Sequence, residues 1–257
     1  MKKNIAKSFS FAKRDFKNRY VGTGLGQFWF ILSPIIMITI YSIIFSDFMK
    51  MKMNIVDNTY AYSIYLIPGI LAWTTFSTII SRLSSSFDQR SSFLKKINIP
   101  MYTFFLSTVL TEFFVFIISY TLALCFLFIV GHEITWTFLY LIPVMTLQVL
   151  FAFGLGVIFS LFTPFLKDIK VVIPIILQLW FWMTPIIYMK EMVNEKYPLI
   201  LVYNPFFYFI DIYHNIFLYS KAPSLNQLTT LLIMTIVVLL IAMYLYKKMI
   251  STIKDIL

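Results

Sequence analysis

The chain has 257 residues, of which 60% are hydrophobic and 12% charged, with a net charge of +10 and a mean hydropathy of +0.84. A soluble domain carries about 25% charged residues, so this composition excludes a soluble globular protein. In lipid only helices and closed barrels satisfy their own backbone, and the uncharged runs here exceed the roughly 10-residue segments of a barrel. We therefore predict an all-α membrane protein.

The first 20 residues predict an amphipathic helix lying on the membrane surface. At 100° per residue the apolar and the cationic side chains take opposite faces: Ile5, Phe9, Ala12 and Phe16, with Tyr20 at the edge, against Lys3, Lys7, Arg14 and Lys17. Cations before an apolar run also resemble a signal peptide, but the run is too long and no A-x-A site follows it. We expect this helix to be retained.

Uncharged runs predict six membrane spans, at 27–48, 63–80, 101–130, 137–163, 171–189 and 225–246. With the N-terminus inside, the inner connections and the tail 247–257 hold 16 of the 21 Lys and Arg residues. The positive-inside rule then places both termini in the cytoplasm. The whole of 1–257 is expected to form a single transmembrane domain, with the bundle at 27–246.

The cytoplasmic connection 81–100 is too polar for lipid. Leu83, Phe87 and Leu94 share a helical face, and Lys95 and Lys96 follow. Two interpretations stand side by side: a solvated loop whose cations follow the positive-inside rule, and a short helix that docks on a cytoplasmic partner.

Three other features concern the interior of the bundle. Glu112 lies in the third predicted span, where a carboxylate costs about 2.5–3.5 kcal/mol and should face protein or water. Two interpretations of Glu112 remain open: it pairs with a structural partner such as an arginine, or it has a role in transport. Gly154 and Gly156 are expected to permit close helix packing, and Cys125 is expected to be a small core residue.

The outer segment 190–224 holds an apolar stretch that Asn204 and Pro205 divide into two parts, each too short to span. We predict two short helices that re-enter the outer leaflet, sheltered by protein. Asp211 and His214, three residues apart, are expected to pair there, with a structural role favoured over a catalytic one.

The sequence contains no GxxxxGK[ST] nucleotide loop, and its two histidines exclude a His-rich metal site. One carboxylate in the bundle is too little for an ion-coupled relay. Energy for uphill transport would therefore come from a partner on the basic cytoplasmic face.

These motifs resemble the permease subunits of the type-two ABC exporters, and most of all the branch that exports polysaccharides and polyol phosphates. The matching residues run in order along nearly the whole chain: Arg14-Asp15, Arg19-Tyr20, Leu25-Gly26, Trp29, Pro34, Gly69, Trp73, Leu94-Lys95, Pro100, Glu112, Lys167-Asp168-Ile169, Thr184-Pro185-Ile186, Tyr188 and Asn204-Pro205. Lys167 stands where the family has arginine.

The resemblance implies two copies of this chain around a channel, with two copies of a separate ATPase below that bind the ATP and Mg²⁺; this chain would bind no cofactor or metal and no nucleic acid. Its substrate would be a lipid-linked glycan such as O-antigen, capsule or teichoic acid, at the inner membrane of a bacterium. Implied roles are ATPase coupling for Phe87, Arg90, Leu94, Lys95 and Lys96, and substrate entry at the interface helix for Arg14, Arg19 and Tyr20.

Aromatic side chains make up 19% of the chain, which suits a pore that sugar rings can stack against. Candidates for the channel lining are Phe28, Trp29, Tyr41, Trp180, Phe181 and Trp182, with lipid-facing or packing roles as the alternative. An exporter of drugs or small lipids, from the same family, and a lipid-modifying membrane enzyme are the other functions considered.

Overall fold

The computed structural model describes residues 2–44, 59–87 and 100–256, and all regular structure in these ranges is helical. The helices, in chain order, are α1 (Lys2–Asn18), α2 (Trp29–Ser42), α3 (Ala61–Ser84), α5 (Met101–Ile129), α6 (Leu141–Phe162), α7 (Ile169–Met183), α8 (Lys190–Lys196), α9 (Pro198–Tyr203), α10 (Phe207–Tyr219) and α11 (Leu225–Ile256). Short 3-10 turns at Gly26–Phe28 and Trp136–Tyr140 precede α2 and α6. The predicted all-α class is confirmed.

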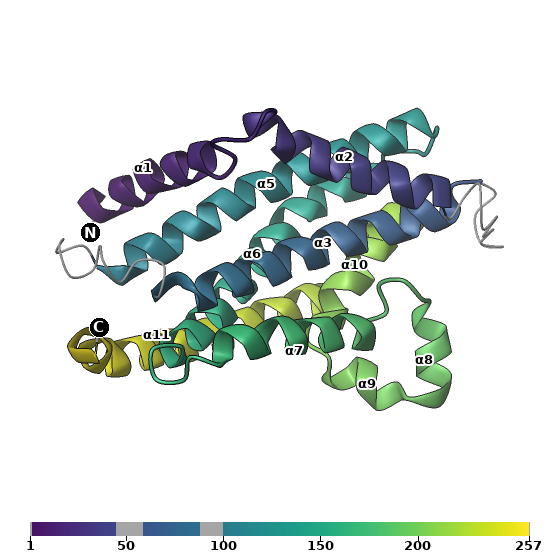
Figure 1. Cartoon of the computed structure of the whole chain (residues 1–257). Helices are drawn as coiled ribbons and strands as arrows, with labels where there is room; N and C mark the ends of the chain where they lie inside the picture. Colours follow the sequence, from purple (N-terminus) through teal and green to yellow (C-terminus); the bar gives the residue numbers. More distant parts are fainter. Residues whose placement is uncertain (1, 45–58, 88–99, 257) are drawn as a thin grey trace.

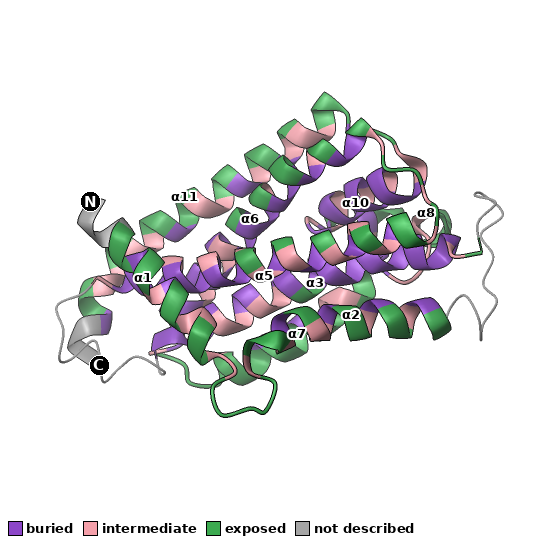
Figure 2. Ribbon diagram, turned by 90° about the horizontal axis from the view of Figure 1, so that it is seen from above, coloured by how far each residue is buried: buried purple, intermediate pink, exposed green. Residues whose placement is uncertain are grey.

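The long helices form one bundle around α3, which is buried along most of its length (Figure 2). In Figure 1, α3 lies between α2 above and α7 below, and both chain ends lie at the same end of the bundle. In Figure 2, α1 crosses α5 obliquely near that end. The opposite end carries α8 and α9 (Figure 1).

Among the described residues, four helical segments are long and apolar enough to cross a membrane: Ala61–Ser84, Met101–Ile129, Trp136–Phe162 and Leu225–Ile253. Two apolar helices at the first and fifth predicted spans are shorter, Gly26–Ser42 and Ile169–Met183. The first predicted span continues into residues outside the described ones. α7 ends before the predicted residue 189 because Thr184 precedes a proline and is extended, with φ −103° and ψ 128°.

The segment 190–224, which was predicted to lie outside, contains three helices instead of the predicted two, because the polar residues Lys190–Lys196 form α8. The break between α9 and α10 falls at Asn204 and Pro205, as predicted. α10 packs against α3 and is largely buried. α11 continues beyond the last predicted span, 225–246, and through the predicted tail to Ile256.

Two glycines of α6 allow close helix contacts, as expected. A Cβ added to Gly156 would lie 2.6 Å from Leu83 Cδ1 of α3, and one added to Gly154 would lie 2.7 Å from Val238 Cγ1 of α11. By contrast, Cys125 is exposed and is not a core residue, because the neighbouring Ala123 and Leu127 occupy the buried face of α5.

Candidate functional site

Four charged side chains meet where α1, α3 and α5 come together, and we call them the charge cluster: Asp15, Arg19, Arg82 and Glu112. Glu112 is only 2% exposed, and its Oε1 accepts hydrogen bonds from both arginines, at 2.9 Å from Arg19 Nη1. Arg82 Nη2 also contacts both oxygens of Asp15, at 2.8 and 2.9 Å. Two positive and two negative charges thus neutralise one another in a partly buried position.

The charge cluster forms because one face of α1 packs on α5. Ser8 and Ala12 are buried, Thr111 donates to the carbonyl of Ala12 at 3.3 Å, and the rings of Phe11 and Phe104 lie 5.1 Å apart. Asp15 follows three residues after Ala12 and therefore lies on the same face. The face of α1 that packs on α5 is therefore rotated slightly from the apolar stripe that the sequence predicts.

The end of α1 is also attached to α2 through aromatic contacts. The ring of Phe16 stacks on Phe30 at 4.0 Å, and Tyr20 meets the same ring edge-on at 4.9 Å. The guanidinium carbon of Arg19 lies 5.6 Å from the centre of the Phe30 ring, within the range of a cation–π contact. Arg14, in contrast, is exposed.

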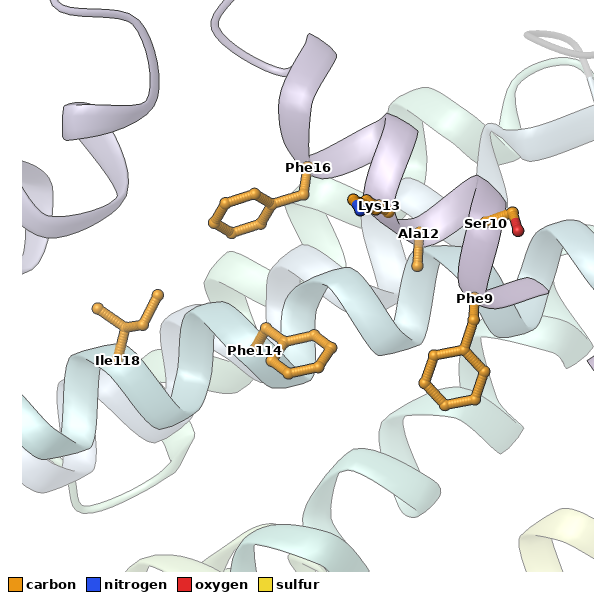
Figure 3. A pocket seen from close by; sticks show the side chains of 7 residues that line it. All are labelled: Phe9, Ser10, Ala12, Lys13, Phe16, Phe114 and Ile118. Atoms are coloured by element: carbon orange, nitrogen blue, oxygen red, sulfur yellow. The ribbon is translucent and has the colours of Figure 1, made fainter. Parts of the chain in front are cut away.

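Part of the predicted apolar stripe of α1 borders a groove of about 490 Å³ between α1 and α5. Figure 3 shows Phe9 and Phe16 of α1 near Phe114 and Ile118 of α5, with Lys13 between the two phenylalanines. Phe9 is 52% exposed. We call this feature the α1 groove; its apolar walls suit an acyl chain, and Lys13 suits an anionic headgroup.

The central helix α3 has one face that is not covered by protein, and every residue on it is polar. Between Ala61 and Ser84, the residues that are not buried are Thr74, Ser77, Thr78, Ser81 and Arg82. We call this set the polar stripe. On one flank it meets α2, and on the other Trp73 contacts Phe181 of α7 at 5.6 Å between ring centres. Lipid is a poor neighbour for such a stripe, whereas water or a hydroxylated substrate is a good one.

The six aromatic residues predicted for a channel divide into two groups. Phe28 and Trp182 are 72% and 58% exposed, and Trp29 and Tyr41 are half-buried. Trp180 and Phe181 instead pack on Trp73, at 6.1 and 5.6 Å between ring centres.

Asn204 connects the end of α7 to the break between α9 and α10, a role that the sequence reasoning missed. Its Oδ1 accepts from Trp180 Nε1 at 2.8 Å and from the backbone N–H of Phe206 at 3.1 Å. Its Nδ2 donates to Thr184 Oγ1 at 2.8 Å and to the carbonyl of Met183 at 3.3 Å. The sequence feature that could have indicated this role is the position of Asn204, a polar residue between two short apolar stretches.

The predicted pairing of Asp211 with His214 is wrong. Asp211 instead contacts Lys190 Nζ at 2.5 Å, and it accepts from Asn215 and Gln227 at 3.1 Å each. His214 is buried against the ring of Tyr65, 3.7 Å away between centres, and its Nε2 has no hydrogen-bond partner. A spacing of three residues on a helix brings Asp211 and His214 close together. The packing of α10 against α3, however, turns the imidazole of His214 inward.

Of the predicted coupling residues, the structure describes only Phe87, which is 1% exposed and meets Phe105 edge-on at 5.7 Å. Arg90, Leu94, Lys95 and Lys96 lie outside the described residues.

A bundle of apolar helices, several of them long enough to span a membrane, defines a multi-pass membrane protein. The chain belongs to the ABC-2 type transporter family, whose model matches residues 8–218. Members of this family are the membrane components of ABC transporters, so the chain is a transport permease and not an enzyme.

Two relatives illustrate the likeness. The O-antigen export system permease protein RfbA of Klebsiella pneumoniae is 28% identical over 193 residues, which is 75% of this chain and 72% of the relative. The O-antigen export system permease protein RfbA of Myxococcus xanthus is 26% identical over 232 residues, which is 90% of this chain and 87% of the relative.

Proposed function

We propose that this chain is the channel-forming permease of an ABC transporter that exports a lipid-linked polysaccharide across the cytoplasmic membrane of a bacterium. The observation that carries the proposal is the likeness to two O-antigen export permeases over 75% and 90% of the chain. The same relatives favour a glycan over the drugs or small lipids considered as the alternative cargo.

The polar stripe of α3 supports this function. Thr74 and Ser77 bond to carbonyls of their own helix, and Arg82 pairs with Asp15 and Glu112, but a continuous row of polar side chains is still unfavourable against lipid. A second copy of the chain, meeting the first along the exposed apolar faces of α2 and α7, would enclose two stripes around a shared path. A glycan, which carries hydroxyls along its whole length, suits such a path.

Energy would come from two copies of a separate ATPase, since the sequence has no nucleotide-binding loop of its own. In this arrangement ATP and Mg²⁺ bind to the ATPase, and residues 81–100 contact it. Both termini would be cytoplasmic, which the charge bias of the loops supports.

The substrate would approach along α1, since a lipid-linked glycan travels in the membrane. The α1 groove, with Lys13 at its rim, offers an apolar wall to the lipid and a cation to its phosphate. Arg14, Arg19 and Tyr20 are the proposed entry residues. Phe28, Trp29, Tyr41 and Trp182 remain the candidates for sugar stacking.

The test is export in cells that lack the partner ATPase or carry an ATPase that binds but does not hydrolyse ATP. We expect the glycan to accumulate on the cytoplasmic side, as seen by its resistance to a glycosidase added outside, and to reach the surface when the wild-type ATPase is restored. Export that continued without ATP hydrolysis would contradict the proposal.

A further inference from the structure

A small cleft between α2, α3 and α5 is lined by several polar side chains. It has a volume of about 160 Å³ and opens beside the charge cluster. The cleft is lined from the three helices by Ser33, Thr75, Thr78 and Glu112. Its remaining polar or aromatic lining includes Arg19 and Trp29, which lie between α1 and α2 or at the start of α2. Thr78 also belongs to the polar stripe, so the cleft opens onto that stripe.

Several polar groups of the cleft are available to a ligand. Among the described residues, the hydroxyls of Ser33, Thr75 and Thr78 make no hydrogen bond to protein, whereas Thr74 and Ser119 bond to carbonyls of their own helices. In addition, both arginines of the charge cluster contact Oε1 of Glu112, so its Oε2 receives neither. Groups of this kind at membrane depth require water or a polar ligand.

The charge of the cleft argues against an anion. Its charged lining consists of Arg19 and Glu112, one positive and one negative, which are already paired at 2.9 Å. A phosphate would meet the carboxylate of Glu112 without a surplus cation to offset it. A neutral ring with several hydroxyls suits the cleft better, because it can donate to Glu112 and exchange hydrogen bonds with the three free hydroxyls.

Size and shape narrow the ligand further. Sites for drug-sized ligands begin at about 300 Å³, so a volume near 160 Å³ suits one ring and not an oligosaccharide. The half-buried indole of Trp29 provides an aromatic face at the same cleft, and the C–H face of a sugar ring packs on such a surface.

From these observations we propose that the cleft is a binding site for a single uncharged sugar residue, held by Glu112, Ser33, Thr75 and Thr78 against Trp29. The proposal rests on the proposed function, and it assigns one sugar of the exported glycan to this position beside α1. The site would recognise this sugar before the glycan enters the path along the polar stripe.

The binding test uses the full-length chain in lipid nanodiscs and saturation-transfer NMR with methyl α-glycosides of glucose, galactose, mannose and rhamnose as probes. We expect at least one glycoside to bind, and the combined variant Ser33→Ala, Thr75→Val, Thr78→Val to bind it at least tenfold more weakly. The matched control, Thr121→Val with Thr146→Val, removes exposed hydroxyls that bond to their own helices and should bind as wild type does.

Inorganic phosphate serves as the second probe, and it should not displace the glycoside. Displacement by phosphate, binding of no glycoside, or equal binding by the cleft variant and wild type would each overturn the proposal. Gel filtration and thermal unfolding show whether the cleft variant folds; if it does not, the single variant Thr78→Val should still weaken binding, and a failure to do so would overturn the proposal as well.

Export assays separate this proposal from the function on which it rests. If deletion of the chain leaves the surface glycan unchanged, the proposed function is wrong, whatever the nanodiscs bind. If deletion abolishes export while the cleft variant exports and binds glycosides normally, only the cleft site is wrong.

Discussion

Replacing Glu112 with Gln tests the charge cluster most directly. The substitution keeps the size of the side chain and one carbonyl oxygen, but removes the negative charge that Arg19 and Arg82 share. The two arginines would then have only the carboxylate of Asp15 to balance them. We expect the free energy of unfolding to fall.

The magnitude follows from the geometry. A hydrogen bond to a charged group contributes about 1.5–3 kcal/mol, and removing one member of a buried ion pair costs about 3–5 kcal/mol. Glu112 is almost fully buried, but the arginine side chains are each 26% exposed, so water screens part of the interaction. Since Gln still accepts a hydrogen bond, we expect a loss of about 2–3 kcal/mol.

The measurement is reversible unfolding of the full-length chain in mixed micelles, followed by tryptophan fluorescence. Glu133→Gln is the matched control, because Glu133 is exposed at a loop and its substitution should change stability by no more than about 0.5 kcal/mol. Combining Glu112→Gln with Arg19→Gln completes a double-mutant cycle. We expect the double variant to lose at least about 1 kcal/mol less than the sum of the single losses. Losses that simply add would refute a direct interaction between the two side chains.

Three further experiments test other parts of the molecule. Asn204→Ala removes four hydrogen bonds at the end of α7 and should lower the free energy of unfolding by about 3 kcal/mol; a loss under about 1 kcal/mol would contradict the connecting role. Gly156→Ala should cost about 1–3 kcal/mol in the same unfolding assay, because the new Cβ would lie 2.9 Å from a leucine Cβ of α3. Gly24→Ala, where nothing lies within 4 Å, should be nearly neutral. Lys95→Glu with Lys96→Glu should weaken co-purification of the ATPase severalfold through charge reversal, and unchanged co-purification would count against a coupling role.

Much of the fold could be predicted because it depends on local sequence. Long uncharged runs placed α3, α5 and α6 to within a few residues, and also the start of α11, since the backbone in lipid must be helical whatever the neighbours are. The break at Asn204 and Pro205 was also predictable, because a proline restricts the residue before it. The extra helix α8 and the early end of α7 depend on short-range effects that the hydropathy of a run does not reveal.

The contacts within the site were harder to predict from the sequence than the fold was. A carboxylate at position 112 predicts a partner, but its partners are separated from it by 93 and 30 residues, and only the packing of α1 and α3 on α5 selects them. The same holds for α1: amphipathicity placed Phe9 and Ala12 on one apolar face, but Phe9 is exposed, and the buried small residues Ser8 and Ala12 allow the close approach to α5.

The sequence by itself determined that this protein is a helical membrane protein, because composition and run length decide whether a chain is stable in lipid. The tertiary structure decided which polar groups meet. Thr74, Ser77, Thr78 and Ser81 look unremarkable within an apolar helix, and they became a polar stripe only because other helices cover every remaining face of α3. Burial is a property of the assembled bundle, so a face open to substrate is defined by what packs around it.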